Sequence, residues 1–197
     1  MAGPHESLEQ AEHAEHAGHV DKKIALLIAV IALFLAFSET LGKSAQTAAI
    51  SDNVEASNLW AFFQAKTIRM TTLRTAAEQT QPLADSSTDP AIKTAMAKAI
   101  DTWKKTAVRY DDEPETREGR KQLSARAQEA EHKRDLAMAR YHNYEIASAA
   151  HQIGIVLASA SVITGMIVLA WLAGALGIAG LIFTAIGFWA PHAVHLF

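Results

Sequence analysis

The chain has no cysteine among its 197 residues and only five prolines. Without thiols it forms no disulfide and cannot use a cysteine nucleophile, and a zinc ion would depend on histidine and carboxylate ligands. The scarcity of proline leaves long segments without a helix-breaking residue. These absences favour long helices held together by packing rather than by covalent cross-links.

Catalytic motifs are also absent from the sequence. It contains no glycine-rich phosphate loop, no G-x-S-x-G elbow and no H-E-x-x-H pair. The net charge is only −3, and basic residues alternate with acidic ones at helical spacing, which argues against nucleic-acid binding. We therefore expect a protein that is not an enzyme, with no catalytic residues, no cofactor and no nucleic-acid partner.

Two long segments, 24–38 and 152–191, carry no charged residue, whereas residues 42–150 hold 16 of the 18 Lys and Arg. Soluble domains mix the two kinds of residue, and membrane proteins separate them. A membrane helix needs about 17–25 mostly apolar residues. The pattern predicts three transmembrane helices, at 23–41, 153–172 and 176–194.

The boundaries of these spans follow from local composition. The first span comes after about twenty polar residues and has no small-residue cleavage site, so we interpret it as a retained anchor. The segment WLAGALGIAG, at 171–180, contains three glycines and no polar residue. That composition predicts a tight turn between the second and third spans.

The polar middle of the chain, 42–150, predicts an antiparallel, coiled-coil-like helical hairpin outside the bilayer. Turn-forming residues at 80–90 end its first arm, a short helix follows at 90–109, and Pro114 is placed to begin the returning arm. The predicted arms, 23–80 and 115–172, each have 58 residues. The fold class is therefore an all-α membrane protein with three transmembrane helices and a long helical hairpin.

Small and apolar residues recur at heptad spacing along both arms and predict the buried seam. On the first arm the seam is interrupted by two charged residues, Asp52 and Lys66, and its positions are Ala45, Ala49, Asp52, Ala56, Leu59, Phe63, Lys66, Met70, Leu73 and Ala77. On the second arm they are Leu123, Ala127, Ala130, Ala137, Tyr141, Tyr144 and Ser148. The face of the short helix consists of Ile92, Met96, Ile100, Trp103 and Ala107. An alanine-rich seam buries little area, so we expect self-association.

One segment carries a family resemblance. EASNLWAFFQAKTIR, from Glu55 to Arg69, resembles the E-A-S-x-x-W-A-x-x-Q-A-K-x-I-[KR] signature of the bacterial domain of unknown function 4337 family. Members of that family share the acidic, His-rich N-terminus and the apolar C-terminal pair. The resemblance implies a bacterial membrane location and supplies no activity.

The same segment is apolar on more than one side of its helix. Its aromatic residues either pack against the short helix that carries Trp103 or form a subunit, partner or ligand interface. The candidate interface residues are Trp60, Phe62, Phe63, Gln64 and Lys66.

The remaining candidate sites are ionisable. His13, His16 and His19 lie in an acidic tail, 1–22, which is a candidate metal site, a pH sensor or a solvated tail. Steps of three residues rotate each histidine by about 60° from the previous one, which works against a compact site. Glu39 and His151 are expected near each other at the membrane interface, as a possible ionisable pair.

These observations lead to one main expectation about function. We expect a multi-pass bacterial inner-membrane protein, in contact with the lipid bilayer, that self-associates as a scaffold or as an accessory subunit of an unidentified membrane partner. The alternative is a small oligomeric transport or pH- or metal-sensing component that uses interfacial histidine and glutamate. Lys22 and Lys23 favour a cytoplasmic N-terminus and a periplasmic hairpin.

Overall fold

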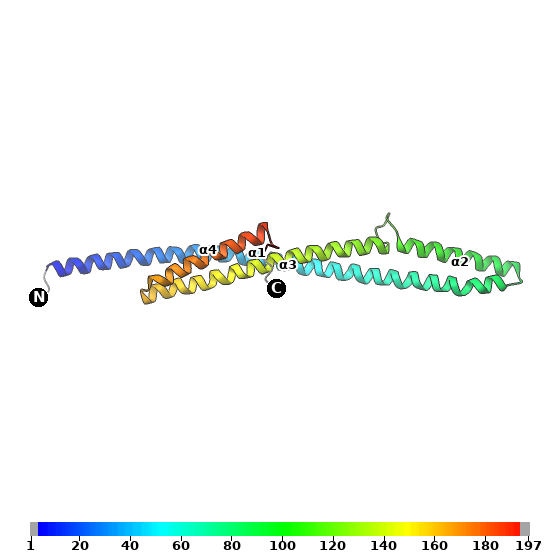
Figure 1. Cartoon of the computed structure of the whole chain (residues 1–197), viewed down its shortest axis with the longest axis horizontal. Helices are drawn as coiled ribbons and strands as arrows, with labels where there is room; N and C mark the ends of the chain where they lie inside the picture. The colour runs from blue at the N-terminus through cyan, green and yellow to red at the C-terminus, as the bar shows by residue number, and fades with distance from the viewer. Residues whose placement is uncertain (1–3, 194–197) are drawn as a thin grey trace. The chain divides into compact units, whose positions relative to one another are not determined.

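The structure is a computed structural model that describes the backbone of residues 4–193 and the side chains of residues 22–193. The described residues form four helices and no strand: α1 (Pro4–Ser86), α2 (Pro90–Asp111), α3 (Arg120–Thr164) and α4 (Ile167–Trp189), as Figure 1 shows. The predicted all-α class is confirmed. Helices α1, α3 and α4 each contain a stretch long and apolar enough to cross a membrane.

The chain divides into two compact units. The first, which we call the terminal unit, consists of Met1–Ala48 and Leu136–Phe197. The second, the central unit, is Ala49–Asp135. Helices α1 and α3 contribute residues to both units, and each unit has its own buried clusters.

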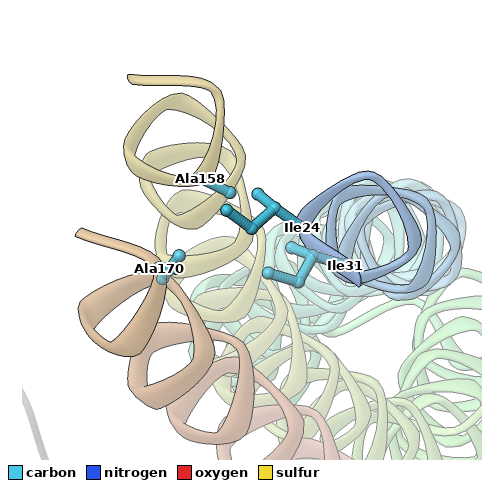
Figure 2. Packing of buried hydrophobic residues seen from close by; sticks show 5 residues of the cluster. Ile24, Ile31, Ala158 and Ala170 are labelled. Carbon is cyan, nitrogen blue, oxygen red and sulfur yellow. The ribbon is translucent and has the colours of Figure 1, made fainter. Parts of the chain in front are cut away.

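In the terminal unit, α4 lies alongside α1 and α3 (Figure 1). Two isoleucines of α1, Ile24 and Ile31, pack against alanines of α3 and α4 (Figure 2). Ala158 and Ala173 are completely buried at this contact. Small side chains allow helix backbones to approach closely, which is how helices associate where the surroundings are as apolar as the contact itself.

The turn between α3 and α4 lies at residues 165–166, so the predicted turn at 171–180 is wrong. Gly165 adopts φ 70, a left-handed conformation that favours glycine. The Ser161 hydroxyl donates a 2.9 Å hydrogen bond to the Met166 carbonyl and closes the turn. Helix α3 therefore ends at Thr164 and α4 at Trp189, earlier than the predicted spans end.

The glycines expected to form that turn instead lie inside α4 and serve close packing. A Cβ on Gly177 would meet Ile31 at 3.3 Å, and a Cβ on Gly180 would meet His151 Nε2 at 2.5 Å. A glycine inside a helix has no side chain, so neighbouring helices can pack closely against it. Composition alone did not distinguish these two uses of glycine.

In the central unit, α1 and α3 run antiparallel, as the contacts of Asn53 with Arg134 and of Thr67 with Arg120 show. The predicted seam is confirmed at most of its positions. Its buried members in this unit are Ala49, Ala56, Leu59, Lys66, Met70, Ala77, Leu123, Ala127 and Ala130. Asp52, Phe63 and Leu73 are half-buried.

Helix α1 continues past the predicted stop at residue 80 and includes Pro82. Pro82 lies close to the C-terminal end, so the missing N–H interrupts only the last part of the helix. The next helix begins where Asp89 caps it, because its Oδ1 accepts hydrogen bonds from the backbone N–H groups of Ala91 (2.8 Å) and Ile92 (3.4 Å). Pro90 then occupies the first turn, where a proline suits a helix.

The connection between α2 and α3 spans residues 112–119, and Pro114 does not begin α3 as predicted. Residues 114–117 form a turn in which Arg117 has φ 58, and α3 begins only at Arg120. Gly119 lies against the backbone of Glu113, so that a side chain at this position would collide with it. Because the end of this loop packs closely against its start, α3 begins later in the chain than predicted.

Candidate functional site

Lys66 is a buried cation in the central unit, with 6% of its surface exposed. Its Nζ lies 3.2 Å from Glu113 Oε2 and 4.0 Å from Glu118 Oε2, both in the connection between α2 and α3. The same ammonium lies 4.9 Å from the centre of the Tyr110 ring and 5.5 Å from that of Phe62. Lys66 therefore holds the connection against α1 by ion pairs and cation–π contacts.

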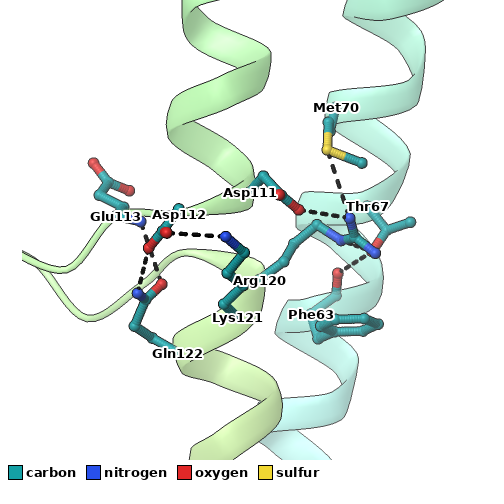
Figure 3. Close-up of polar contacts among 9 residues, drawn as sticks. All are labelled: Phe63, Thr67, Met70, Asp111, Asp112, Glu113, Arg120, Lys121 and Gln122. Atoms are coloured by element: carbon teal, nitrogen blue, oxygen red, sulfur yellow. Dashed lines mark hydrogen bonds and ion pairs between the residues drawn. The ribbon is translucent and has the colours of Figure 1, made fainter.

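Arg120, the first residue of α3, also contacts both a carboxylate and an aromatic ring, as Lys66 does (Figure 3). Its Nη1 lies 2.9 Å from Asp111 Oδ1, and its Nε donates a 2.8 Å hydrogen bond to Thr67 Oγ1. Its guanidinium lies 4.9 Å from the centre of the Phe63 ring. Arg120 thus joins the end of α2, the start of α3 and the middle of α1, a role that sequence reasoning missed.

The aromatic residues of the signature segment pack within the chain. Trp60 Nε1 donates a 2.9 Å hydrogen bond to Glu131 Oε1, and Trp60 meets Phe63 edge to face at 5.4 Å. Trp60, Phe62 and Phe63 pack on the buried cluster that contains Leu123. Trp103 packs in a different cluster, with Ile100.

These contacts place the five candidate interface residues. Four of them, Trp60, Phe62, Phe63 and Lys66, are engaged with residues of the same chain. Only Gln64 lies on the exposed face of α1. The signature segment therefore packs against the same chain on one side and is exposed on the side that carries Gln64.

A charged cluster at the start of α3 surrounds Asp112. Gln122 Nε2 donates a 2.6 Å hydrogen bond to Asp112 Oδ1, and Lys121 Nζ lies 3.1 Å from Asp112 Oδ2. These contacts lower the pKa of the Asp112 carboxyl, first through Gln122 and then through Lys121. The same ion pair raises the pKa of Lys121.

The terminal unit contains a polar cluster among its apolar helices. His151 and Ser38 are buried, with 0% and 1% of their surfaces exposed. Ser38 Oγ lies 3.5 Å from His151 Nδ1 and 3.0 Å from Thr184 Oγ1, so the cluster joins α3, α1 and α4. Among the side chains that the structure describes, His151 Nε2 has no hydrogen-bond partner, although it is buried.

The predicted pair of Glu39 and His151 is not formed. Gln152 Nε2 donates a 3.3 Å hydrogen bond to Glu39 Oε1, while His151 faces Ser38. Pairing of the matched arms predicts Glu39 beside residue 156, so the predicted register was wrong by four residues, about one helical turn. The missed partner of the histidine was the serine next to Glu39, Ser38. Ser38 was visible as a polar residue in the first span, but nothing in the sequence linked it to His151.

The candidate metal residues His13, His16 and His19 lie outside the part of the chain whose side chains the structure describes. Among residues with described side chains, no three His, Cys, Asp or Glu residues lie close enough together to hold a metal ion.

Comparison with known families gives one match, which covers nearly the whole chain. The model of the family described as "Domain of unknown function (DUF4337)" matches residues 20–190. The chain belongs to this family. The match includes both units and the signature segment, so the resemblance noted from Glu55 to Arg69 is confirmed. No curated protein and no solved structure matches the chain.

Proposed function

We propose that this DUF4337 protein is a non-enzymatic integral membrane protein that self-associates as a scaffold or accessory subunit. One observation carries the membrane assignment: the most apolar helices leave most of their surface outside the fold. Only 17%, 33% and 17% of the apolar stretches of α1, α3 and α4 are buried within the chain. In water that surface would be strongly unfavourable, whereas lipid would cover it.

The dimensions of α4 support the same assignment. Its 23 residues extend about 34 Å, close to the thickness of a hydrocarbon core. Trp171 and Trp189 lie towards its two ends and are 76% and 78% exposed. Indole side chains favour the two membrane–water interfaces, so their positions fit a helix that crosses once.

Alkaline carbonate extraction of membranes tests this part of the proposal. The protein is expected to stay in the membrane pellet and to be released only by detergent. Release into the carbonate supernatant would contradict it. A reporter at Ser86 that is active only outside the cytoplasm tests the proposed periplasmic location of the central unit and the cytoplasmic N-terminus in the bacterial inner membrane.

Self-association is supported by the outer face of α1 in the central unit. Ile50, Val54 and Ile68 are 60%, 52% and 67% exposed, and the spacing of four and fourteen residues places them along one side. This side lies opposite the seam that faces α2 and α3. A second copy would cover this stripe of apolar residues at heptad spacing.

Substitution of the stripe tests this assembly. The double variant Ile50→Gln and Val54→Gln is expected to lower the oligomer size in detergent, measured by light scattering after size exclusion. Val108→Gln, at a residue of α2 that is 65% exposed, is the matched control and should leave the size unchanged. A monomeric wild-type protein would contradict the proposal.

The buried histidine favours a second candidate function, in a transport or sensing component. His151 is an ionisable side chain among apolar helices, and such residues often mark ion or substrate paths. Ion flux into liposomes that contain the wild-type protein, but not the His151→Ala variant, would favour this candidate over the scaffold. Sealed liposomes with both proteins would exclude a transport path.

A further inference from the structure

A groove of about 270 Å³ lies between α1 and α3 in the terminal unit. Its charged lining residues are Glu39, Lys43 and Glu145, and all three are exposed. Tyr141, Tyr144 and Ser148 add hydroxyl groups. This volume is near the lower end of small-ligand sites, about 300 Å³, and fits one compact polar group.

The groove lies at the level where the apolar helices end. Tyr144 occupies the space left by the missing side chain of Gly187, two residues before α4 ends at Trp189. On α1, Glu39 and Lys43 are the first charged residues after the uncharged segment 24–38. If the apolar helices cross a bilayer, as proposed above, the groove faces the headgroup region.

The surface below the groove continues as apolar side chains. One turn before Glu39 on α1 is Leu35, and two turns after Ser148 on α3 is Val156, which is 66% exposed. A molecule whose polar end occupies the groove would thus have its apolar part against both helices. A phospholipid has this arrangement of polar and apolar parts.

The charges of the lining select among headgroups. Two carboxylates and one ammonium give the groove a negative balance, which disfavours a headgroup with only a phosphate. A primary ammonium can donate hydrogen bonds to carboxylates, whereas a trimethylammonium has no N–H donor. The lysine supplies a cation for the phosphate of the same headgroup.

We propose that this groove binds a zwitterionic phospholipid with a primary ammonium, of the phosphoethanolamine type. Glu39 and Glu145 accept hydrogen bonds from the ammonium, and Lys43 donates to the phosphate. Glu39 retains its hydrogen bond from Gln152, and the Tyr141 hydroxyl lies 3.4 Å from Glu145 Oε1. These neighbours hold the carboxylates at the edge of the groove.

Native mass spectrometry of the full-length protein in detergent tests this site. The probe is an equimolar mixture of phosphatidylethanolamine, phosphatidylglycerol and phosphatidylcholine with identical acyl chains. Retention of phosphatidylethanolamine is expected to exceed that of the other two about tenfold, as for one charge-assisted hydrogen bond. Equal retention of all three, or a preference for another headgroup, would overturn the proposal.

Variants locate the preference in the groove. Glu145→Gln is expected to remove the preference, because Glu145 receives the ammonium. Lys43→Gln is expected to lower the retention of all three lipids, because each carries a phosphate, while Lys43→Arg keeps the retention and shows that the fold tolerates substitution there. The matched controls are Lys133→Gln and Glu129→Gln, which remove the same charges from an exposed pair on α3 outside the groove. If the control variants lose the preference equally, the groove is not its source.

A soluble competitor separates the lipid from its free headgroup. Excess O-phosphoethanolamine is expected to leave the bound lipid in place, because it lacks the acyl chains that lie on the helices. Displacement of the lipid by this excess would overturn the assignment to a lipid. This inference rests on the proposed membrane location, and carbonate extraction tests that location separately: a protein retained in the membrane without headgroup preference contradicts the groove alone.

Discussion

The terminal and central units are built from the same two long helices, yet different contacts hold them together. In the terminal unit, α1, α3 and α4 meet through alanine, glycine and serine, and the polar contacts are between neutral side chains such as Ser38 and Thr184. In the central unit, Lys66 and Arg120 cross between helices with carboxylates and aromatic rings.

The proposed membrane location of the terminal unit would account for this difference. Water covers the outside of a soluble unit, so charged heads are solvated at little cost while their stems pack inside. An apolar environment gives no such solvation, and close backbone packing with shared hydroxyl contacts replaces ion pairs. If this interpretation is correct, substitutions that remove a charge should destabilise the central unit more strongly. Substitutions that add volume should destabilise the terminal unit more strongly.

The largest loss of stability is expected when Lys66, the buried cation of the central unit, is removed. Lys66→Ala leaves Glu113, whose side chain is 17% exposed, without its nearest partner, and should destabilise the central unit by about 3 kcal/mol. Faster amide hydrogen exchange in 105–131 measures the loss. Lys105→Ala removes an exposed ion pair with Asp101 and should change exchange little, by about 0.5 kcal/mol or less. Equal effects of the two variants would contradict the role of Lys66.

A volume change in the terminal unit should have the next largest effect. Gly180→Ala places a Cβ against the buried His151 ring and should destabilise the unit by about 2 kcal/mol through overpacking. The control is Gly174→Ala, since nothing lies within 4 Å of a Cβ at that position. Thermal unfolding in detergent should separate the two, and similar melting temperatures would show that α4 does not pack on His151.

A smaller effect is expected at Trp60. Trp60→Phe keeps an aromatic ring but removes the hydrogen bond to Glu131, with an expected cost of about 1 kcal/mol. The variant should form oligomers of wild-type size, because the indole N–H is used within the chain. A change of oligomer size with unchanged stability would assign Trp60 to the subunit interface instead.

The smallest loss of stability is expected when the pH is lowered. Because the folded-state pKa of Asp112 is lowered, its contribution to stability is present above the usual carboxyl pKa of 3.8 and is lost as the pH falls through the lower folded value. Wild-type protein should therefore lose some order in 112–122 below about pH 4, as followed by hydrogen exchange. Asp112→Asn should show no such acid step, and an identical step in both proteins would assign it to another group.

The sequence predicted the periodic parts of this fold well. Heptad spacing located the seam from Ala45 to Ala77, whereas the matched arm lengths placed Glu39 about one turn away from its contact with Gln152. Those features repeat over many turns, so that single exceptions such as Asp52 do not obscure the pattern.

The features that were missed depend on contacts distant in sequence. Glycines of α4 were assigned to a turn because their packing partners, Ile31 and His151, lie more than twenty residues away. The start of α3 was placed at Pro114, since the approach of Gly119 to Glu113 cannot be read from local propensity. The candidate groove likewise combines residues that are about one hundred positions apart in the chain.

The short turn at Gly165 has a consequence for how the chain enters a membrane. It contains no lysine or arginine and is closed by Ser161 on Met166. In the proposed topology, with a cytoplasmic N-terminus and a periplasmic central unit, this uncharged corner lies on the cytoplasmic side of the bilayer. Because the corner carries no lysine or arginine, the proposed orientation would depend on charged residues elsewhere, beginning with Lys22 and Lys23.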